Sequence, residues 1–177
     1  MEFNQFIAVL DTNVLVSMPV ADTLLRLAEE PPFYLPRWSE EILQELDRTF
    51  QKLGRTPAQI DRRIGVMRQH FPEAIVVGYE GLADSLDVDP KDRHVLACAI
   101  RAGAHAIVSN NRKDFPPATM RRLGIECLTA GEFLRQQYHM SPDRFIQILE
   151  DQHEFVGMSM AQLLDKLPKE LTELIHF

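Results

Sequence analysis

Short apolar runs alternate with longer amphipathic stretches along the first three quarters of the chain. Runs short enough for buried strands cover residues 6–10, 33–35, 74–77 and 106–108, and 125–128 is a further strand candidate. Helical patterns separate these runs. Because strands that alternate with helices form parallel sheets covered by helices, the pattern predicts an α/β fold with a central, mostly parallel sheet.

The predicted helices are bounded by recognisable start and stop residues. Ser39, Thr56 and Thr129 are good N-cap residues, Pro57 suits a first helical position, and Gly54 and Gly103 suit helix ends. We expect a loop over the acidic segment 78–88. The predicted helices cover 20–30, 40–53, a stretch from Pro57, a stretch from Asp89–Asp92 to 102, 119–123 and 130–137.

The pattern changes near residue 140. Three helix starts follow, at Ser141-Pro142, near Met158–Ala161 and at Pro168, and no strand pattern appears among them. We therefore divide the chain into an α/β domain over residues 1–138 and a helical C-terminal extension over residues 139–177.

Composition narrows the function classes. The net charge of −7 disfavours a protein that coats nucleic acid nonspecifically, although it does not exclude a nuclease with acidic metal ligands. Cys98 and Cys127 lie in apolar surroundings, so we expect free thiols, and the lack of a CxxC pair leaves a zinc–thiolate site unsupported. We expect no signal peptide and no membrane span, and therefore a cytoplasmic protein.

Acidic residues occur where the sheet would present its carboxyl edge. Asp11 follows the run 6–10, Asp92 opens a helix, and Asn111 and Asp114 follow the run 106–108. Sites in open α/β sheets form beyond the carboxyl ends of strands. Converging carboxylates repel one another unless cations neutralise them, and oxygen-rich clusters suit Mg²⁺ or Mn²⁺. The sequence therefore indicates metal-assisted chemistry on phosphate esters.

Each of these residues also has a purely structural interpretation. Asp11 and Asp114 suit turns, as do Ser109 and Asn111, and Asp92 suits a helix N-terminus. Glu45, at the margin of an apolar helix stripe, resembles an ordinary surface glutamate. We interpret His94 and His105 as structural or surface residues. A phosphatase with Asp11 as its nucleophile would need a second acid two residues later, where this chain has Asn13.

The order of the motifs is more specific than any one of them. Leu10–Leu15, Glu41–Leu46, Asp89–Asp92 and Val108–Phe115, taken together, resemble a PIN domain, and especially the VapC-type toxins of bacterial toxin–antitoxin pairs. The resemblance covers roughly residues 6–137. It implies a three-layer α/β/α fold and a metal-dependent endoribonuclease that uses Mg²⁺ or Mn²⁺. It also implies an RNA substrate, a cognate antitoxin and a homodimer.

The resemblance assigns roles to individual residues. The last acidic position of the family falls on either Asn111 or Asp114 of this chain. The expected catalytic residues are Asp11, Glu45, Asp92 and Asp114; the metal ligands are Asp11, Asp92 and Asp114; the substrate-binding residues are Asn13, Ser109, Asn111, Arg112 and Lys113.

Two alternatives stay open within this fold. One is a nuclease that acts on single-stranded or flap DNA. The other is a catalytically weak PIN fold that binds RNA or protein, which the amide at Asn111 motivates because an amide is a weaker metal ligand than a carboxylate.

Overall fold

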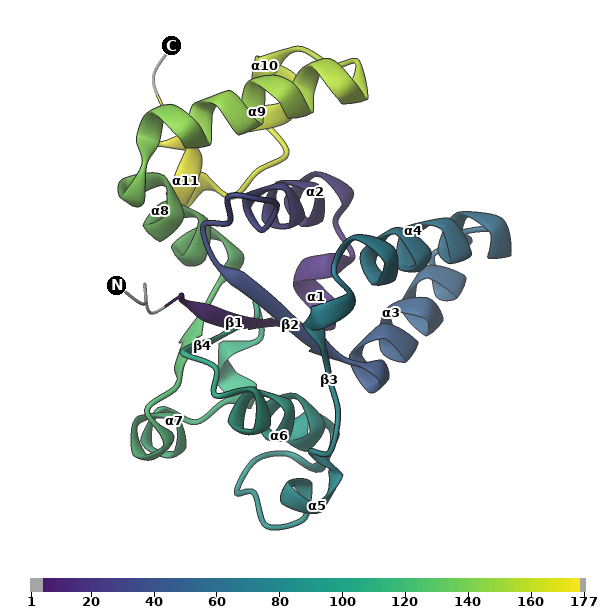
Figure 1. Ribbon diagram of the computed structural model, residues 1–177, viewed down its shortest axis with the longest axis vertical. Coiled ribbons are helices and arrows are strands. Elements are labelled where there is room, and N and C mark those ends of the chain that lie inside the picture. The colour runs from purple at the N-terminus through teal and green to yellow at the C-terminus, as the bar shows by residue number, and fades with distance from the viewer. Residues whose placement is uncertain (1–4, 176–177) are drawn as a thin grey trace.

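The fold is built on a five-stranded sheet. The computed structural model describes residues 5–175 (Figure 1). All strand pairs are parallel, in the order β3-β2-β1-β4-β5. The strands are β1 (Ile7–Leu10), β2 (Leu35–Ser39), β3 (Ile75–Val76), β4 (Ala106–Val108) and β5 (Glu126–Leu128). The predicted α/β class with a parallel central sheet is confirmed.

Helices connect the strands and continue after the last of them. Three single turns of 3-10 helix are η1 (Pro72–Ala74), η2 (Pro90–Asp92) and η3 (Arg112–Asp114). The α-helices are α1 (Thr12–Leu15), α2 (Met18–Leu27), α3 (Glu40–Lys52), α4 (Pro57–His70), α5 (Glu80–Ala83), α6 (Arg93–Ala102), α7 (Pro117–Leu123), α8 (Ala130–Met140), α9 (Pro142–Val156), α10 (Met160–Leu164) and α11 (Lys169–Thr172).

The helices form layers on the two faces of the sheet. In Figure 1, α6 and α7 lie below the strands, while α2 and α8 lie above them and α9 lies above α2 and α8. The central strand β1 is buried between these layers, and its residues Ala8, Val9 and Leu10 are 0% exposed. This is the expected three-layer α/β/α arrangement. Among residues 5–175, no helix is long and apolar enough to cross a membrane.

Strand β2 differs from its prediction. We expected residues 33–35, whereas the strand covers Leu35–Ser39 and contains Pro36. In a parallel ladder, successive residues bond to opposite neighbours, and Leu35 N–H donates toward β1. The missing N–H of Pro36 therefore faces β3, whose pairing with β2 begins only at Trp38. A proline is tolerated at a place where no partner strand needs its donor.

Helix boundaries differ from the prediction at several places. Helix α2 covers Met18–Leu27 instead of 20–30, and α7 begins at Pro117 instead of residue 119. The segment 78–88, expected as a loop, contains the one-turn helix α5. The segment that begins at Asp89 first forms the 3-10 turn η2, in which the Asp89 side chain accepts from Lys91 N–H, and α6 follows. Helix α8 continues to Met140, so the predicted boundary between residues 138 and 139 falls inside a helix.

The C-terminal helices share the core of the sheet domain. Phe145 and Leu149 of α9 are fully buried in the same hydrophobic cluster as β1. Gln152 Oε1 accepts from the Thr23 hydroxyl (2.8 Å), which fastens α9 to α2 by a buried hydrogen bond. Segment 168–170 packs so closely on α8 that a Cβ at Gly131 would lie 2.5 Å from Glu170 Oε2. The extension is therefore packed onto the helices above the sheet.

Candidate active site

The candidate site lies at the carboxyl edge of the sheet, where β1 and β4 are neighbours. The strand order reverses at this point, because the chain adds β2 and β3 on one side of β1 and β4 and β5 on the other. Such a switch point leaves a crevice in which open α/β sheets bind their ligands. Asp11 N–H donates to the Val108 carbonyl (3.1 Å), which places the residues after both strands side by side.

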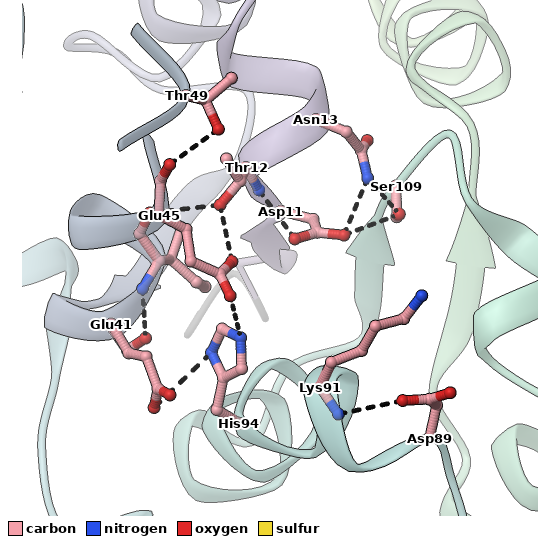
Figure 2. A network of polar contacts seen from close by, with 12 residues as sticks. Asp11, Thr12, Asn13, Glu41, Glu45, Thr49, Asp89, Lys91, His94 and Ser109 are labelled. Carbon is pink, nitrogen blue, oxygen red and sulfur yellow. Dashed lines mark hydrogen bonds and ion pairs between the residues drawn. The ribbon is translucent and has the colours of Figure 1, made fainter. Parts of the chain in front are cut away.

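The Asp11 carboxylate is held by three hydrogen-bond donors, which come from its own loop and from the residue after β4. Its Oδ1 accepts from Thr12 N–H (2.8 Å), and its Oδ2 accepts from the Ser109 hydroxyl (2.8 Å) and the Asn13 amide (2.9 Å) (Figure 2). Asn13 also accepts from Asn110 N–H (2.8 Å). Asn13 and Ser109 were predicted to bind substrate. In the structure, their side chains donate hydrogen bonds that orient Asp11.

Four carboxylates line one open cleft of about 400 Å³, which we call the acidic cleft. All four are among the expected catalytic residues. Asp11 follows β1 directly, and the other three lie in α3, η2 and η3, so the fold gathers residues far apart in the sequence. The lining residues are Asp11, Thr12, Asn13, Val16, Glu45, Thr49, Lys91, Asp92, Asn111 and Asp114.

The surroundings of Asp11 and Asp92 in the cleft disfavour the ionised forms of both side chains. Burial raises the pKa of Asp11, and the hydrogen bonds from Ser109 and Thr12 only partly offset this. Burial and then the neighbouring charge of Asp114 raise the pKa of Asp92 to about 6. Asp92 Oδ2 is buried and has no hydrogen-bond partner among residues 5–175. An ionised carboxylate in such a place needs a cation.

The donor set fits a hard divalent cation. Asp11, Asp92 and Asp114 offer carboxylate oxygens, which Mg²⁺ and Mn²⁺ prefer, and Asp92 Oδ2 lacks a hydrogen-bond partner among the described residues. Within the described part of the chain, no three His, Cys, Asp or Glu side chains already surround a common metal position. Side-chain rotation would therefore have to accompany binding.

Glu45 projects from α3 into the cleft, and Thr12 and His94 hold its carboxylate. Its Oε2 accepts from the Thr12 hydroxyl (3.1 Å), and its Oε1 lies 3.0 Å from His94 Nε2 (Figure 2). Burial would raise the pKa of Glu45, but the bond and charge of His94, with the Thr12 bond, outweigh it and lower the pKa. Burial would lower the pKa of His94, but Glu45 and Glu41 raise it.

Neither of the two predicted basic contacts, Arg112 and Lys113, lines the acidic cleft among the described residues. Arg112 pairs with Glu132 of α8 (2.7 Å) and lines a second groove of about 740 Å³, instead of the acidic cleft where we expected it. We call it the β5 groove, because Glu126, Cys127 and Leu128 of β5 line it. The β5 groove and the cleft share a wall, since Asn111 and Asp114 line the cleft while Arg112 and Phe115 line the groove. Lys113 lines neither among the described residues.

The family profile described as "PIN domain" matches residues 8–113, a stretch that contains the residues of the acidic cleft except Asp114, which follows it directly. The chain belongs to the PIN domain family. Over 103 residues this PIN domain is 39% identical to a Mycobacterium tuberculosis protein named "Putative ribonuclease VapC50". The match covers 56% of this chain and 61% of that relative, so it spans about three fifths of the relative's length. No solved structure matches this PIN domain.

Sequence reasoning missed two residues of the PIN domain site. Lys91 lines the cleft, and Figure 2 shows its side chain extending from η2 toward Asp11 and Ser109. The position of Lys91 directly before Asp92 could have indicated that it lies near the site. His94 was interpreted as structural or surface, although it is buried against Glu45. Glu45 and His94 are 49 positions apart in the sequence, and no local pattern signals their contact. His105 is structural, since its Nδ1 accepts from Ile7 N–H.

Asp92→Asn should change the pH dependence of metal-free stability. The folded pKa of Asp92, about 6, exceeds its ordinary 3.8, so the folded protein binds this proton more tightly than the unfolded chain. The wild type therefore loses stability as pH rises from about 4 to 6 and loses no more from this group above that. We expect the stability gained by Asp92→Asn to grow through this window in urea unfolding with chelator. A difference that is constant with pH would contradict this.

Proposed function

We propose that this PIN domain is a Mg²⁺- or Mn²⁺-dependent endoribonuclease and the toxin of a type II toxin–antitoxin pair, acting in the cytoplasm. The observation that carries the proposal is the convergence of Asp11, Glu45, Asp92 and Asp114 on one cleft at the sheet's switch point. Family membership supports the nuclease, and the name of the Mycobacterium tuberculosis relative supports RNA as the substrate class.

The roles follow from the position of each side chain. Asp11, Asp92 and Asp114 would hold the cation, which supplies Lewis-acid polarisation of the scissile phosphate when bound. Ser109 and Asn13 keep the Asp11 carboxylate aimed into the cleft through their hydrogen bonds. Glu45 is hydrogen-bonded on both oxygens and faces the cleft, so it would orient the attacking water and accept its proton.

Basic residues around the cleft would hold the RNA backbone. Lys91 lies within the acidic cleft, and no carboxylate of residues 5–175 lies within 4.0 Å of its ammonium group, so it is available to a phosphate. Arg121 and Arg135 line the β5 groove with Arg112, next to the wall that contains Asn111. Together with Lys113 of η3, these cations would contact phosphates without reading the base sequence.

Control of such an enzyme requires a partner. The proposal includes a cognate antitoxin whose basic side chain enters the acidic cleft and replaces the cation there, and a homodimer of the toxin. The cleft supports the first part, because its clustered carboxylates favour any cation that reaches them. We also propose that residues 1–138 carry the nuclease and that residues 139–177 support it structurally.

The test is cleavage of matched RNA and DNA. Purified protein is incubated with a structured RNA and with single-stranded and flap DNA of the same sequence, in Mg²⁺, in Mn²⁺ and in chelator. We expect discrete RNA fragments that require metal and no cut DNA. Cleavage of DNA alone would instead establish a DNA nuclease. RNA binding without turnover in either metal would establish a binding module.

A further inference from the structure

His94 contacts Glu45 but does not itself line the acidic cleft among the described residues. It is the second residue of α6 and is 7% exposed, and it is not among the described residues that line the acidic cleft. Its route to the cleft is the bond to Glu45. The hydrogen bond that joins His94 to a residue of the cleft is therefore the one to that carboxylate.

The bond direction follows from the chemistry of the two groups. An ionised Glu45 only accepts hydrogen bonds, so the 3.0 Å contact with Oε1 requires a hydrogen on His94 Nε2. The Thr12 hydroxyl donates to the other oxygen at 3.1 Å, so donors from α6 and α1 hold both oxygens. A glutamate fixed in this way has already lost the rotamer freedom that it would otherwise lose on binding substrate.

The second ring nitrogen of His94, Nδ1, lies near another glutamate of α3. Glu41 and Glu45 lie four residues apart on α3, so their carboxylates share one face of the helix and repel each other. His94 lies between them, with Nδ1 3.8 Å from Glu41 Oε2 (Figure 2). This nitrogen has no hydrogen-bond partner among residues 5–175, so the bond to Glu45 is the one that directs the ring.

We propose that His94 is a positioning residue that holds the Glu45 carboxylate in the acidic cleft and thereby sets the turnover number of the nuclease; this rests on the proposed function. His94 touches neither substrate nor cation in this assignment. Its loss should lower kcat and leave KM nearly unchanged, because the groups that hold RNA phosphates stay in place. A catalytic group that is displaced by about 1 Å costs about 100-fold in rate, and we expect a fall in kcat of this size.

Two amide substitutions separate the roles of the two ring nitrogens. The side-chain nitrogen of His94→Gln falls near the position of Nε2 and can donate to Glu45, whereas that of His94→Asn falls near Nδ1 and faces Glu41. We expect His94→Gln to keep kcat within several-fold, and His94→Asn and His94→Ala to lose about 100-fold. Equal losses in all three, or full activity in His94→Ala, would overturn the proposal.

A double-mutant cycle shows whether His94 acts through Glu45. We expect His94→Ala to have no further effect on kcat in a Glu45→Ala background, because the group that it positions is already gone. Additive losses would show that His94 acts by another route. The matched control is His105→Gln, which removes a histidine bonded to the backbone of β1 and outside the described lining of the cleft; it should change the melting temperature and leave kcat unchanged.

A spectroscopic readout keeps the inference testable without activity. In ¹⁵N-labelled protein, the Nε2–H proton of His94 should give a solvent-protected resonance that disappears or moves in Glu45→Ala. An unchanged resonance would overturn the proposed bond. If the wild type cleaves no RNA while this resonance behaves as expected, the proposed function fails and the structural link between His94 and Glu45 stands.

Discussion

Asp11→Asn is expected to abolish RNA cleavage while leaving the fold intact. Asp11 lines the acidic cleft and is held there by bonds from Thr12, Ser109 and Asn13, so its carboxylate is the best-oriented cation ligand. Loss of a metal-assisted step worth several kcal/mol corresponds to at least about a 1000-fold fall in kcat. Single-turnover cleavage in Mg²⁺ and Mn²⁺ measures this.

The same substitution should leave the metal-free protein at least as stable as the wild type. Burial raises the pKa of Asp11, so its ionised form opposes folding at neutral pH. An asparagine removes that charge and keeps a carbonyl oxygen for Thr12 N–H. Thermal unfolding in chelator tests this beside Asp61→Asn, which removes an exposed acid of α4 as the matched control. A large fall in melting temperature specific to Asp11→Asn would show a structural role.

Metal removal is the second large effect that we expect. Chelator should stop RNA cleavage completely, and Mg²⁺ or Mn²⁺ should restore it. A cation that binds only the folded protein also stabilises it, by about 2.7 kcal/mol at a concentration 100 times its Kd. The melting temperature should therefore rise with Mn²⁺ concentration in the wild type and in Asp61→Asn, and stay flat in Asp92→Asn. Cleavage that persists in chelator would contradict the assignment of these acids.

The sequence was most informative where a local rule determines the structure. The buried runs before Asp11 and after Gly103 form strands, and the N-caps Ser39, Thr56 and Thr129 begin helices as predicted. Such features depend on a few adjacent residues. The parallel order of the strands then brings Asp11 and Ser109 to one edge, so much of the acidic cleft was predictable from motif order.

The remaining features depend on contacts between distant segments. Strand β2 tolerates Pro36 only because β3 is too short to reach it, which the local pattern does not encode. Arg112 turns away from the cleft because Glu132, on a later helix, offers it a partner. His94 reaches Glu45 only through the placement of α6 beside α3. Each case is a tertiary contact that overrides a local expectation.

The bond between Thr23 and Gln152 has an evolutionary consequence. The family profile ends at residue 113, yet Gln152 is buried against α2, inside the matched region. A PIN domain that lost these terminal helices would uncover Thr23 and the apolar side chains of α2 and α8, whose exposure favours aggregation. Relatives without the extension should therefore carry polar residues at those positions, and positions 23 and 152 should change together across lineages that keep it.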